Sequence, residues 1–262
     1  MDRIYDFIGS KVRPIELAMF LKFLLGAKRK LYTIRNFELS LDPVSNFGMR
    51  LIKHGYYEPD TTKQIVDILQ EGDTFIDLGG NEGYFSLIAS RRVGKTGHVY
   101  CIEPQSRLFE IILNNANRNK CYNITLLPYA ASDKIEEIEI ILSPTLNTGS
   151  STVVSNRRKA LWKKQKLMTT TLDDLFYYPD RKPIKLLKVD IEGFEFFAMK
   201  GAKKLLENRL FEYISIEMHP VQLKQLGQSE EMILDFLKEY GYEGSNGLFT
   251  HKEKIMAEKV VG

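Results

Sequence analysis

The chain has 262 residues, of which 44% are hydrophobic, and this is enough to bury one large core and carry an extension. Its formal net charge is only +3, so no strong overall field indicates a nucleic acid as the partner. The two cysteines, Cys101 and Cys121, give neither a disulfide framework nor the spacing of a metal site. No stretch reaches the roughly 18 apolar residues of a membrane span, and the N-terminus lacks a signal-peptide cleavage pattern, so we expect a cytoplasmic protein.

Residues 1–54 are predicted to form an extension that precedes a main domain over residues 55–262. Within the extension, residues 14–26 read as a short, strongly apolar helix, and the basic residues 28–30 follow it. Two interpretations stay open. The helix is either a peripheral anchor on a membrane surface, or it docks on the main domain or on the second subunit of a homodimer. Charged residues interrupt the already short run, which favours docking.

The next elements lead into the main domain. Residues 37–41 alternate like a strand, and a helix is predicted from residue 60 to residue 69. Glu58, just ahead of that helix, is counted with the residues expected to contact a cofactor. From Gly72 onward the order is strand, helix, strand, helix, strand, which predicts a parallel α/β sheet.

Residues 75–86 form the most informative stretch, because an apolar strand runs into a glycine-rich turn and then into a helix. Gly79 and Gly80 remove side chains that would keep a ligand from the backbone, and Gly83 lets the helix start close to the strand. The helix N-terminus offers unpaired N–H donors. The turn therefore predicts a nucleotide-like cofactor, and the alternative is that the glycines serve only tight packing.

Asp77 narrows the choice of cofactor. The spacing of the glycines does not match the G-x-G-x-x-G fingerprint of dinucleotide sites, and a carboxylate lies two positions before the first glycine. A carboxylate in that place repels phosphate and suits an amino group. S-adenosylmethionine has a cationic methionyl end and no phosphate, so it is favoured over the dinucleotide of a dehydrogenase.

A second acid supports the same cofactor. Residues 97–102 follow a short buried-strand pattern, and Glu103 comes directly after it. Adjacent strands of a doubly wound sheet end side by side, so Glu103 is placed to accept hydrogen bonds from both ribose hydroxyls. Pro104 ends the strand and starts a helix. A plain helix cap is the alternative reading of Glu103.

The third strand is predicted over residues 123–128, with small residues at its carboxyl end. Ala131 and Ser132 there would leave room for an adenine ring. Residues 135–142 alternate acid and isoleucine, which indicates an edge or hairpin strand with one wet face. Its expected role is structural.

Two further strands, over residues 184–190 and 213–219, each deliver acids at their carboxyl ends, where open α/β sheets bind ligands. A helix follows near residues 230–240. Residues 242–252 then read as an antiparallel β-hairpin turning through Asn246-Gly247.

Several of these segments together resemble the FkbM family of class I S-adenosylmethionine-dependent methyltransferases. They are residues 75–86, Glu103-Pro104 with Phe109 and Asn114, residues 189–195 with Gly201-Ala202, and residues 216–219. The sequence Asp-Ile-Glu-Gly-Phe-Glu at residues 190–195 points to this family, because the glycine turn alone indicates only the superfamily. Where the family usually has Gly-Ala-Asn, this chain has Gly-Gly-Asn at residues 79–81, a mild change that should leave the turn intact.

The resemblance implies a doubly wound, Rossmann-like methyltransferase sheet, mostly parallel with a C-terminal antiparallel hairpin strand and an N-terminal helical extension. It also implies methyl transfer to oxygen, often on a sugar, glycolipid or polyketide hydroxyl. Such a hydroxyl is a very weak acid, so a positioned base or a divalent metal is expected beside it.

Five titratable residues at the two later strand ends are candidates for this chemistry. They are Asp190, Glu192, Glu195, Glu217 and His219. His219 is the expected general base, since its ordinary pKa of about 6.5 suits proton removal near neutrality. Glu195 is read equally well as a negative charge in the first turn of a helix. Asp190, Glu217 and His219 form a plausible set for Mg or Mn, with spacing that is not diagnostic.

Residues 146–168 are expected to shape the acceptor site. A polar stretch at residues 148–152 precedes several Lys and Arg residues that bracket Trp162. Such a segment suits a sugar or a phosphorylated glycan through ring stacking and charge-assisted hydrogen bonds. An RNA ligand and a solvated basic helix without a ligand are the alternatives.

The sequence thus predicts an O-methyltransferase that acts on a small-molecule or glycan hydroxyl. An RNA methyltransferase and a non-catalytic cofactor-binding scaffold are the other readings. The residues expected around the cofactor are Glu58, Asp77, Gly79, Gly80, Asn81, Gly83, Glu103, Pro104, Ala131, Ser132 and Asp190. Those expected at the acceptor are Asp190, Glu192, Glu217 and His219.

Overall fold

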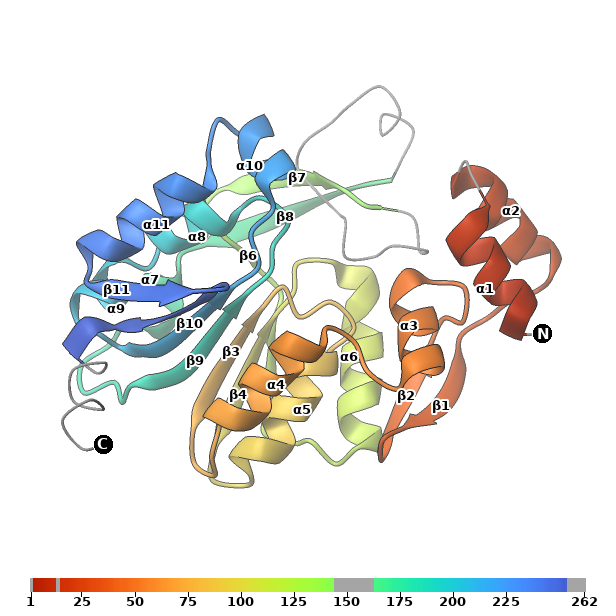
Figure 1. Ribbon diagram of the computed structural model, residues 1–262, viewed down its shortest axis with the longest axis horizontal. Coiled ribbons are helices and arrows are strands. Elements are labelled where there is room, and N and C mark those ends of the chain that lie inside the picture. Colours follow the sequence, from red (N-terminus) through yellow and green to blue (C-terminus); the bar gives the residue numbers. More distant parts are fainter. Residues whose placement is uncertain (1, 13–14, 144–162, 254–262) are drawn as a thin grey trace.

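The computed structural model describes residues 2–12, 15–143 and 163–253, and its centre is a seven-stranded sheet (Figure 1). The strand order is β11-β12-β10-β9-β3-β4-β5, and the five strands from β10 to β5 run parallel. These strands are β3 (Thr74–Leu78), β4 (His98–Ile102), β5 (Ile124–Leu127), β9 (Ile184–Val189), β10 (Phe211–Ile216), β11 (Tyr242–Ser245) and β12 (Leu248–His251). The predicted mostly parallel sheet with an antiparallel C-terminal hairpin is confirmed.

The order of the strands reverses beside β3. From β3 the chain moves to β4 and β5 on one side and later to β9 and β10 on the other. The carboxyl ends of β3 and β9 therefore flank the switch point at which open α/β sheets bind their ligands.

Helices cover both faces of this sheet, because successive strand residues point to opposite sides. Phe75 packs with α4 (Pro59–Ile68) and α5 (Tyr84–Val93), whereas the next residue, Ile76, belongs to the core beneath α8, α9 and α11. The bounds of the other helices on these faces are α6 (Ser106–Arg118), α7 (Leu172–Phe176), α8 (Glu195–Lys200), α9 (Lys203–Glu207), α10 (Pro220–Gln225) and α11 (Glu230–Glu239). The predicted helices at residues 60–69 and 230–240 are thereby confirmed.

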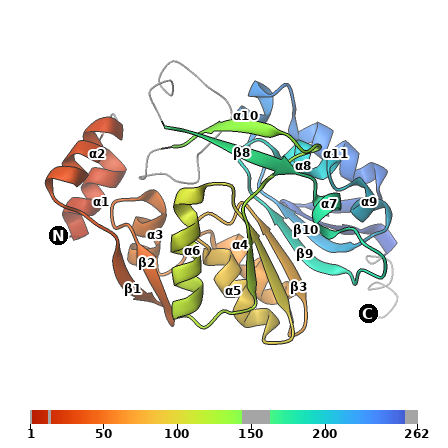
Figure 2. The same ribbon diagram turned by 180° about the vertical axis from the view of Figure 1, so that it is seen from behind.

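A small second sheet, with the order β6-β8-β7, lies over the carboxyl edge (Figures 1 and 2). It consists of β6 (Ala130–Ala131), β7 (Glu137–Ile141) and β8 (Lys164–Thr170). The predicted edge strand is confirmed in β7, whose Glu137 and Glu139 are exposed and pair with lysines of β8. The basic-helix reading of residues 146–168 is wrong for residues 164–168, which belong to β8; residues 146–162 of that segment lie outside the described residues.

The N-terminal region contains α1 (Asp2–Lys11), α2 (Ile15–Leu24), β1 (Lys30–Ile34), β2 (Phe37–Leu41) and α3 (Asn46–His54). The predicted apolar helix corresponds to α2 and the predicted strand to β2, whereas α1, β1 and α3 were not expected. Leu39 and Leu41 of β2 share a core with Phe75, so part of the extension is packed into the main domain. Among the helices that the structure describes, none is long and apolar enough to cross a bilayer.

Candidate active site

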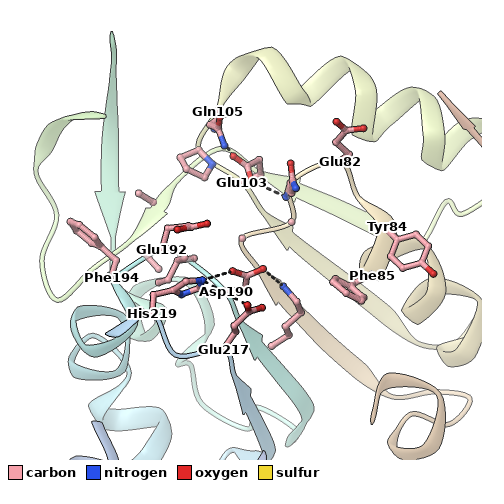
Figure 3. Close-up of a pocket in the computed structure, with 18 of the residues that line it drawn as sticks. Glu82, Tyr84, Phe85, Glu103, Gln105, Asp190, Glu192, Phe194, Glu217 and His219 are labelled. Atoms are coloured by element: carbon pink, nitrogen blue, oxygen red, sulfur yellow. Dashed lines mark hydrogen bonds and ion pairs between the residues drawn. The ribbon is translucent and has the colours of Figure 1, made fainter. Parts of the chain in front are cut away.

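A cavity of about 300 Å³ opens at the switch point, above the carboxyl ends of β3, β4, β9 and β10 (Figure 3). Its wall brings together most of the predicted site residues, from segments far apart in the sequence. They are Glu58, Gly79, Gly80, Asn81, Glu103, Pro104, Ala131, Asp190, Glu192, Glu217 and His219. Figure 3 shows Glu103 at one side of this cavity and Asp190, Glu217 and His219 gathered at the other.

Three of the residues expected around the cofactor do not lie on this wall. Gly83 has a φ of 84° and begins α5, and it faces Ile112. Ser132 is buried, with its backbone N–H donating to Thr170 at 2.9 Å. Asp77 is fully buried, and its carboxylate lies against Ser86 and Lys188; its expected contact with a cofactor amino group stays a prediction.

The glycine turn packs closely against the next strand end. A Cβ atom on Gly79 would lie 1.8 Å from the Asp190 carbonyl oxygen, and the Gly79 backbone has a φ of 86°. A Cβ atom on Gly80 would lie 2.2 Å from the sulfur of Cys101. Both positions therefore need glycine for tight packing. Both glycines also line the cavity, where the absence of a side chain leaves the backbone open to a ligand.

A Gly79→Ala variant is expected to lose about 2 kcal/mol or more of unfolding free energy, since it combines left-handed backbone strain with a backbone clash. Gly227→Ala is the matched control, because Gly227 also has a positive φ, 73°, but no atom within 4 Å of its Cβ position. That control should lose only about 1 kcal/mol. Urea unfolding of both variants measures the difference, and equal losses would show that the contact with Asp190 is not rigid.

Glu103 fixes the turn to the end of β4. Its buried carboxylate accepts hydrogen bonds from the backbone N–H of Asn81 at 2.8 Å and of Gln105 at 2.9 Å. Burial raises the pKa of Glu103 to about 7 and outweighs these two hydrogen bonds, which lower it. The N-cap residue of α6 is Gln105 and not Glu103. The simple helix-cap reading of Glu103 is therefore incomplete, because its carboxylate also binds the glycine turn at Asn81.

Binding of S-adenosylhomocysteine is expected to depend on pH through Glu103. If the ionised carboxylate holds the ribose, a free-protein pKa of about 7 makes affinity about tenfold weaker at pH 6 than at pH 8. Titration calorimetry at both pH values measures this, and binding at pH 7 should release about half a proton per bound ligand to the buffer. The Glu103→Gln variant is the control and should bind weakly at both pH values; an unchanged pH dependence in that variant would assign the effect to another group.

The carboxyl ends of β9 and β10 bring three predicted residues into one cluster. The Nε2 atom of His219 lies 3.7 Å from Asp190 Oδ1 and 3.9 Å from Glu217 Oε1. One ligand atom from each residue lies within 4.8 Å of the others, a spacing that suits a metal ion as well as a proton relay. The cluster is therefore able to stabilise a cation.

Glu195 holds the histidine from the other side. Its Oε1 atom lies 2.7 Å from His219 Nδ1 and accepts a hydrogen bond from the Gly193 backbone at 3.0 Å. Glu195 is the first residue of α8, as the helix-charge interpretation predicted. It is also fully buried beside His219, as a residue of the acid cluster would be. Glu192 lies outside that helix, with a φ of 53°, and accepts a hydrogen bond from Gln222 at 2.7 Å.

These acids change the protonation of His219. Burial lowers the pKa of His219, but the hydrogen bond and charge of Glu195 and the charges of Glu192 and Asp190 outweigh it and raise the pKa to about 9. This pKa lies above the ordinary histidine value of about 6.5 on which the sequence analysis relied, and it favours the protonated imidazole at neutral pH.

Lys188 is a site residue that the sequence analysis missed. It is buried at the end of β9 and lines the cavity, with Nζ 3.5 Å from Asp77 Oδ1 and 3.3 Å from Asp190 Oδ2. The Nζ atom also lies 4.9 Å from the centre of the Phe85 ring. The available signal was a lysine inside the apolar run of a buried strand, since such a charge needs a partner.

Apolar and aromatic side chains complete the cavity. Phe47, Tyr57, Tyr84 and Phe85 line one part, and Ile138 and Ile140 of β7 line another. The strand β7, for which a structural role was expected, thus also forms part of the cavity wall. A second hollow, of about 530 Å³, adjoins the cavity and shares Glu58, Lys188 and Glu217 with it.

Comparison with known proteins supports the family that the sequence resembles. A sequence model described as a methyltransferase FkbM domain matches residues 77–243. Methyltransferase sdnD of Sordaria araneosa is 26% identical over 194 residues, covering 62% of this chain and 74% of that protein. The hexuronic acid methyltransferase AglP of Haloferax volcanii is 24% identical over 162 residues, covering 62% of this chain and 62% of that protein.

Among solved structures, a methyltransferase FkbM from Methylobacillus flagellatus KT is 14% identical with a TM-score of 0.45, over 72% of this chain and 50% of that chain. The domain match at residues 77–243 spans more than half of the present chain, from the glycine turn to the C-terminal hairpin. The chain therefore belongs to the FkbM family of S-adenosylmethionine-dependent methyltransferases.

Proposed function

We propose that this chain transfers a methyl group from S-adenosylmethionine to a hydroxyl of a sugar, a glycan or a related small molecule. The observation that carries the proposal is the cluster of Asp190, Glu217 and His219 on the wall of the same cavity as the glycine turn and Glu103. The turn and Glu103 suit the adenosyl part of the cofactor. The cluster suits the hydroxyl that is to be methylated.

The reaction requires an in-line displacement at the methyl carbon. The carbon–sulfur bond breaks as the carbon–oxygen bond forms, and the hydroxyl proton must leave. In this proposal neutral His219 accepts that proton, and Glu195 stabilises the resulting imidazolium through the 2.7 Å contact with Nδ1. Asp190 and Glu217 would orient the hydroxyl by accepting hydrogen bonds from the acceptor.

A divalent metal is a second way to activate the hydroxyl at this cluster. Two carboxylates and one imidazole are donors that Mg and Mn accept in proteins. Asp190, Glu217 and His219 would then hold the ion, and the ion would lower the pKa of the acceptor hydroxyl. Turnover measured after removal of metals with a chelator, and after return of Mg or Mn, distinguishes the two arrangements.

The acceptor class rests on the polarity of the site and on one relative. AglP is named for hexuronic acid, which supports a sugar acceptor for the present chain. The adjoining hollow offers such a ring an approach to Glu217 and Glu58 from the side of Arg50. Charge does not favour RNA, because the part of the chain after Lys30 carries nearly equal numbers of basic and acidic side chains.

Calorimetry with S-adenosylhomocysteine, with NAD as the control ligand, tests the cofactor first. Micromolar binding of the former and none of the latter supports the proposal. Uronic acids, neutral sugars and short RNAs are then screened with labelled S-adenosylmethionine. Methylation of RNA alone, or cofactor binding without transfer to any acceptor, would move the assignment to an RNA methyltransferase or to a non-catalytic scaffold.

A further inference from the structure

An exposed apolar surface covers the two N-terminal helices. Of the twenty large hydrophobic side chains found exposed in the part of the chain that the structure describes, eight lie between Ile4 and Leu25. Phe23 is 79% exposed, more than any other of the twenty. The eight are Ile4, Phe7, Leu17, Met19, Phe20, Phe23, Leu24 and Leu25, and we call them the helical-hairpin surface.

This surface is not needed to hold the two helices in place. The inward side chains of α1 and α2, among them Tyr5, Ile8 and Ala18, form their own small core with Val44. The Lys22–Asp42 ion pair adds a further attachment to the body. The outward apolar residues therefore remain in water, and exposed apolar patches of this kind mark interaction sites.

Charge indicates the kind of partner. The segment from Met1 to Lys30 holds seven Lys and Arg against three Asp and Glu, whereas basic and acidic side chains nearly balance in the remainder of the chain. The positive net charge of the chain thus comes from the segment that carries the helical-hairpin surface. Lys11, Lys28 and Lys30 of this segment are exposed. Apolar side chains beside lysines are the combination that binds an anionic lipid surface.

Dimensions decide how the helices would meet a bilayer. The helix α2 has 10 residues and is about 15 Å long, half of the roughly 30 Å hydrocarbon thickness. It can lie in the interface but cannot span it. Figures 1 and 2 both show α1 and α2 at one end of the long axis, away from β11, so a bilayer could reach them without contacting the C-terminal hairpin.

We propose that the helical-hairpin surface docks the protein on the surface of an anionic lipid bilayer. Docking would also orient the cavity relative to the bilayer. Arg29, directly after the two helices, pairs with the buried Glu82 of the glycine turn, and its Nη1 atom donates to Glu82 Oε2 at 2.9 Å. Glu82 itself lines the cavity. This inference concerns attachment and stands independently of the acceptor.

Vesicle sedimentation of the full chain tests the proposal. The wild type should bind vesicles made of equal parts phosphatidylcholine and phosphatidylglycerol, and bind phosphatidylcholine vesicles far less. A Phe20→Ser/Phe23→Ser variant should lose at least about tenfold in partition, and a Lys28→Glu/Lys30→Glu variant about tenfold on anionic vesicles alone. Tyr122→Ser is the matched control, because Tyr122 is 75% exposed and lies far along the chain from the hairpin, and it should bind as the wild type does.

Thermal unfolding by circular dichroism establishes that each variant is folded, as expected for substitutions of exposed side chains. Failure of the folded wild type to bind anionic vesicles overturns the proposal, and so does undiminished binding by the Phe20→Ser/Phe23→Ser variant. Light scattering in solution measures the oligomeric state of the wild type and of the Phe20→Ser/Phe23→Ser variant. A wild-type dimer that becomes a monomer on the same substitution would assign the surface to a second copy of the chain instead.

Discussion

A His219→Ala variant is expected to keep its affinity for S-adenosylhomocysteine and to lose about 10²- to 10⁴-fold in turnover, the usual contribution of a positioned base. The imidazole lies on the acid cluster, on the other side of the cavity from Glu103, so removing it leaves the adenosyl contacts in place. Calorimetry and single-turnover transfer of labelled methyl separate the two effects. His98→Ala is the control, because that ring binds Thr125 at 2.8 Å and does not line the cavity.

The pH dependence gives a sharper test of the same role. A base with a pKa of about 9 must lose its proton before it can act, so kcat/KM should rise with pH up to about 9. Glu195→Gln keeps a hydrogen-bonding side chain beside Nδ1 but removes the charge, and the inflection should move to lower pH. If the pH profile of kcat/KM is the same in Glu195→Gln as in the wild type, His219 is not the base. A bound metal or a carboxylate would then activate the acceptor hydroxyl.

The same raised pKa has a consequence for stability. Since the folded-state pKa of His219 exceeds the ordinary value of 6.5, the proton stabilises the folded state fully below about pH 6.5, and the benefit is lost as pH rises to about 9. The conditions that activate the base are therefore also those that remove this contribution to stability.

The sequence predicted the elements whose patterns are local. The alternation of residues 37–41, the run from strand to glycine turn at residues 75–86 and the Asn246-Gly247 hairpin each specify their structure from near neighbours, and each was found. The carboxyl ends of parallel strands meet at one edge, which is why acids far apart along the chain could be expected in one cavity.

What could not be predicted depends on contacts between distant segments. The lysines of β8 are also typical of a solvated helix. This segment forms a strand because it pairs with β7, a strand that lies well before it in the chain. The raised pKa of His219 needs Glu195 in a buried position that a sequence pattern does not reveal. The burial of Asp77 against Lys188 could not be predicted either, because the lysine is brought beside it by β9, more than 100 residues further along the chain.

Loss of the buried Lys188 is expected to cost far more stability than loss of a partly exposed lysine on the same strand. Lys188→Met leaves the carboxylate of Asp77 buried without its cation, and removing one partner of a buried pair costs about 3 to 5 kcal/mol. Lys185→Met, on the same strand, is the matched control, because its pair with Glu212 at 2.9 Å is partly exposed and should cost at most about 1 kcal/mol. Urea unfolding measures both.

A double variant decides whether charge or packing is responsible. Lys188→Met/Asp77→Asn removes both members of the pair, and it should regain more than half of the loss, since no uncompensated charge stays buried. A double variant as unstable as the single one would mean that the lysine acts through its packing against Phe85. Recovery, in contrast, would show that this buried cation is what allows two carboxylates, Asp77 and Asp190, to lie close together at the switch point of the sheet.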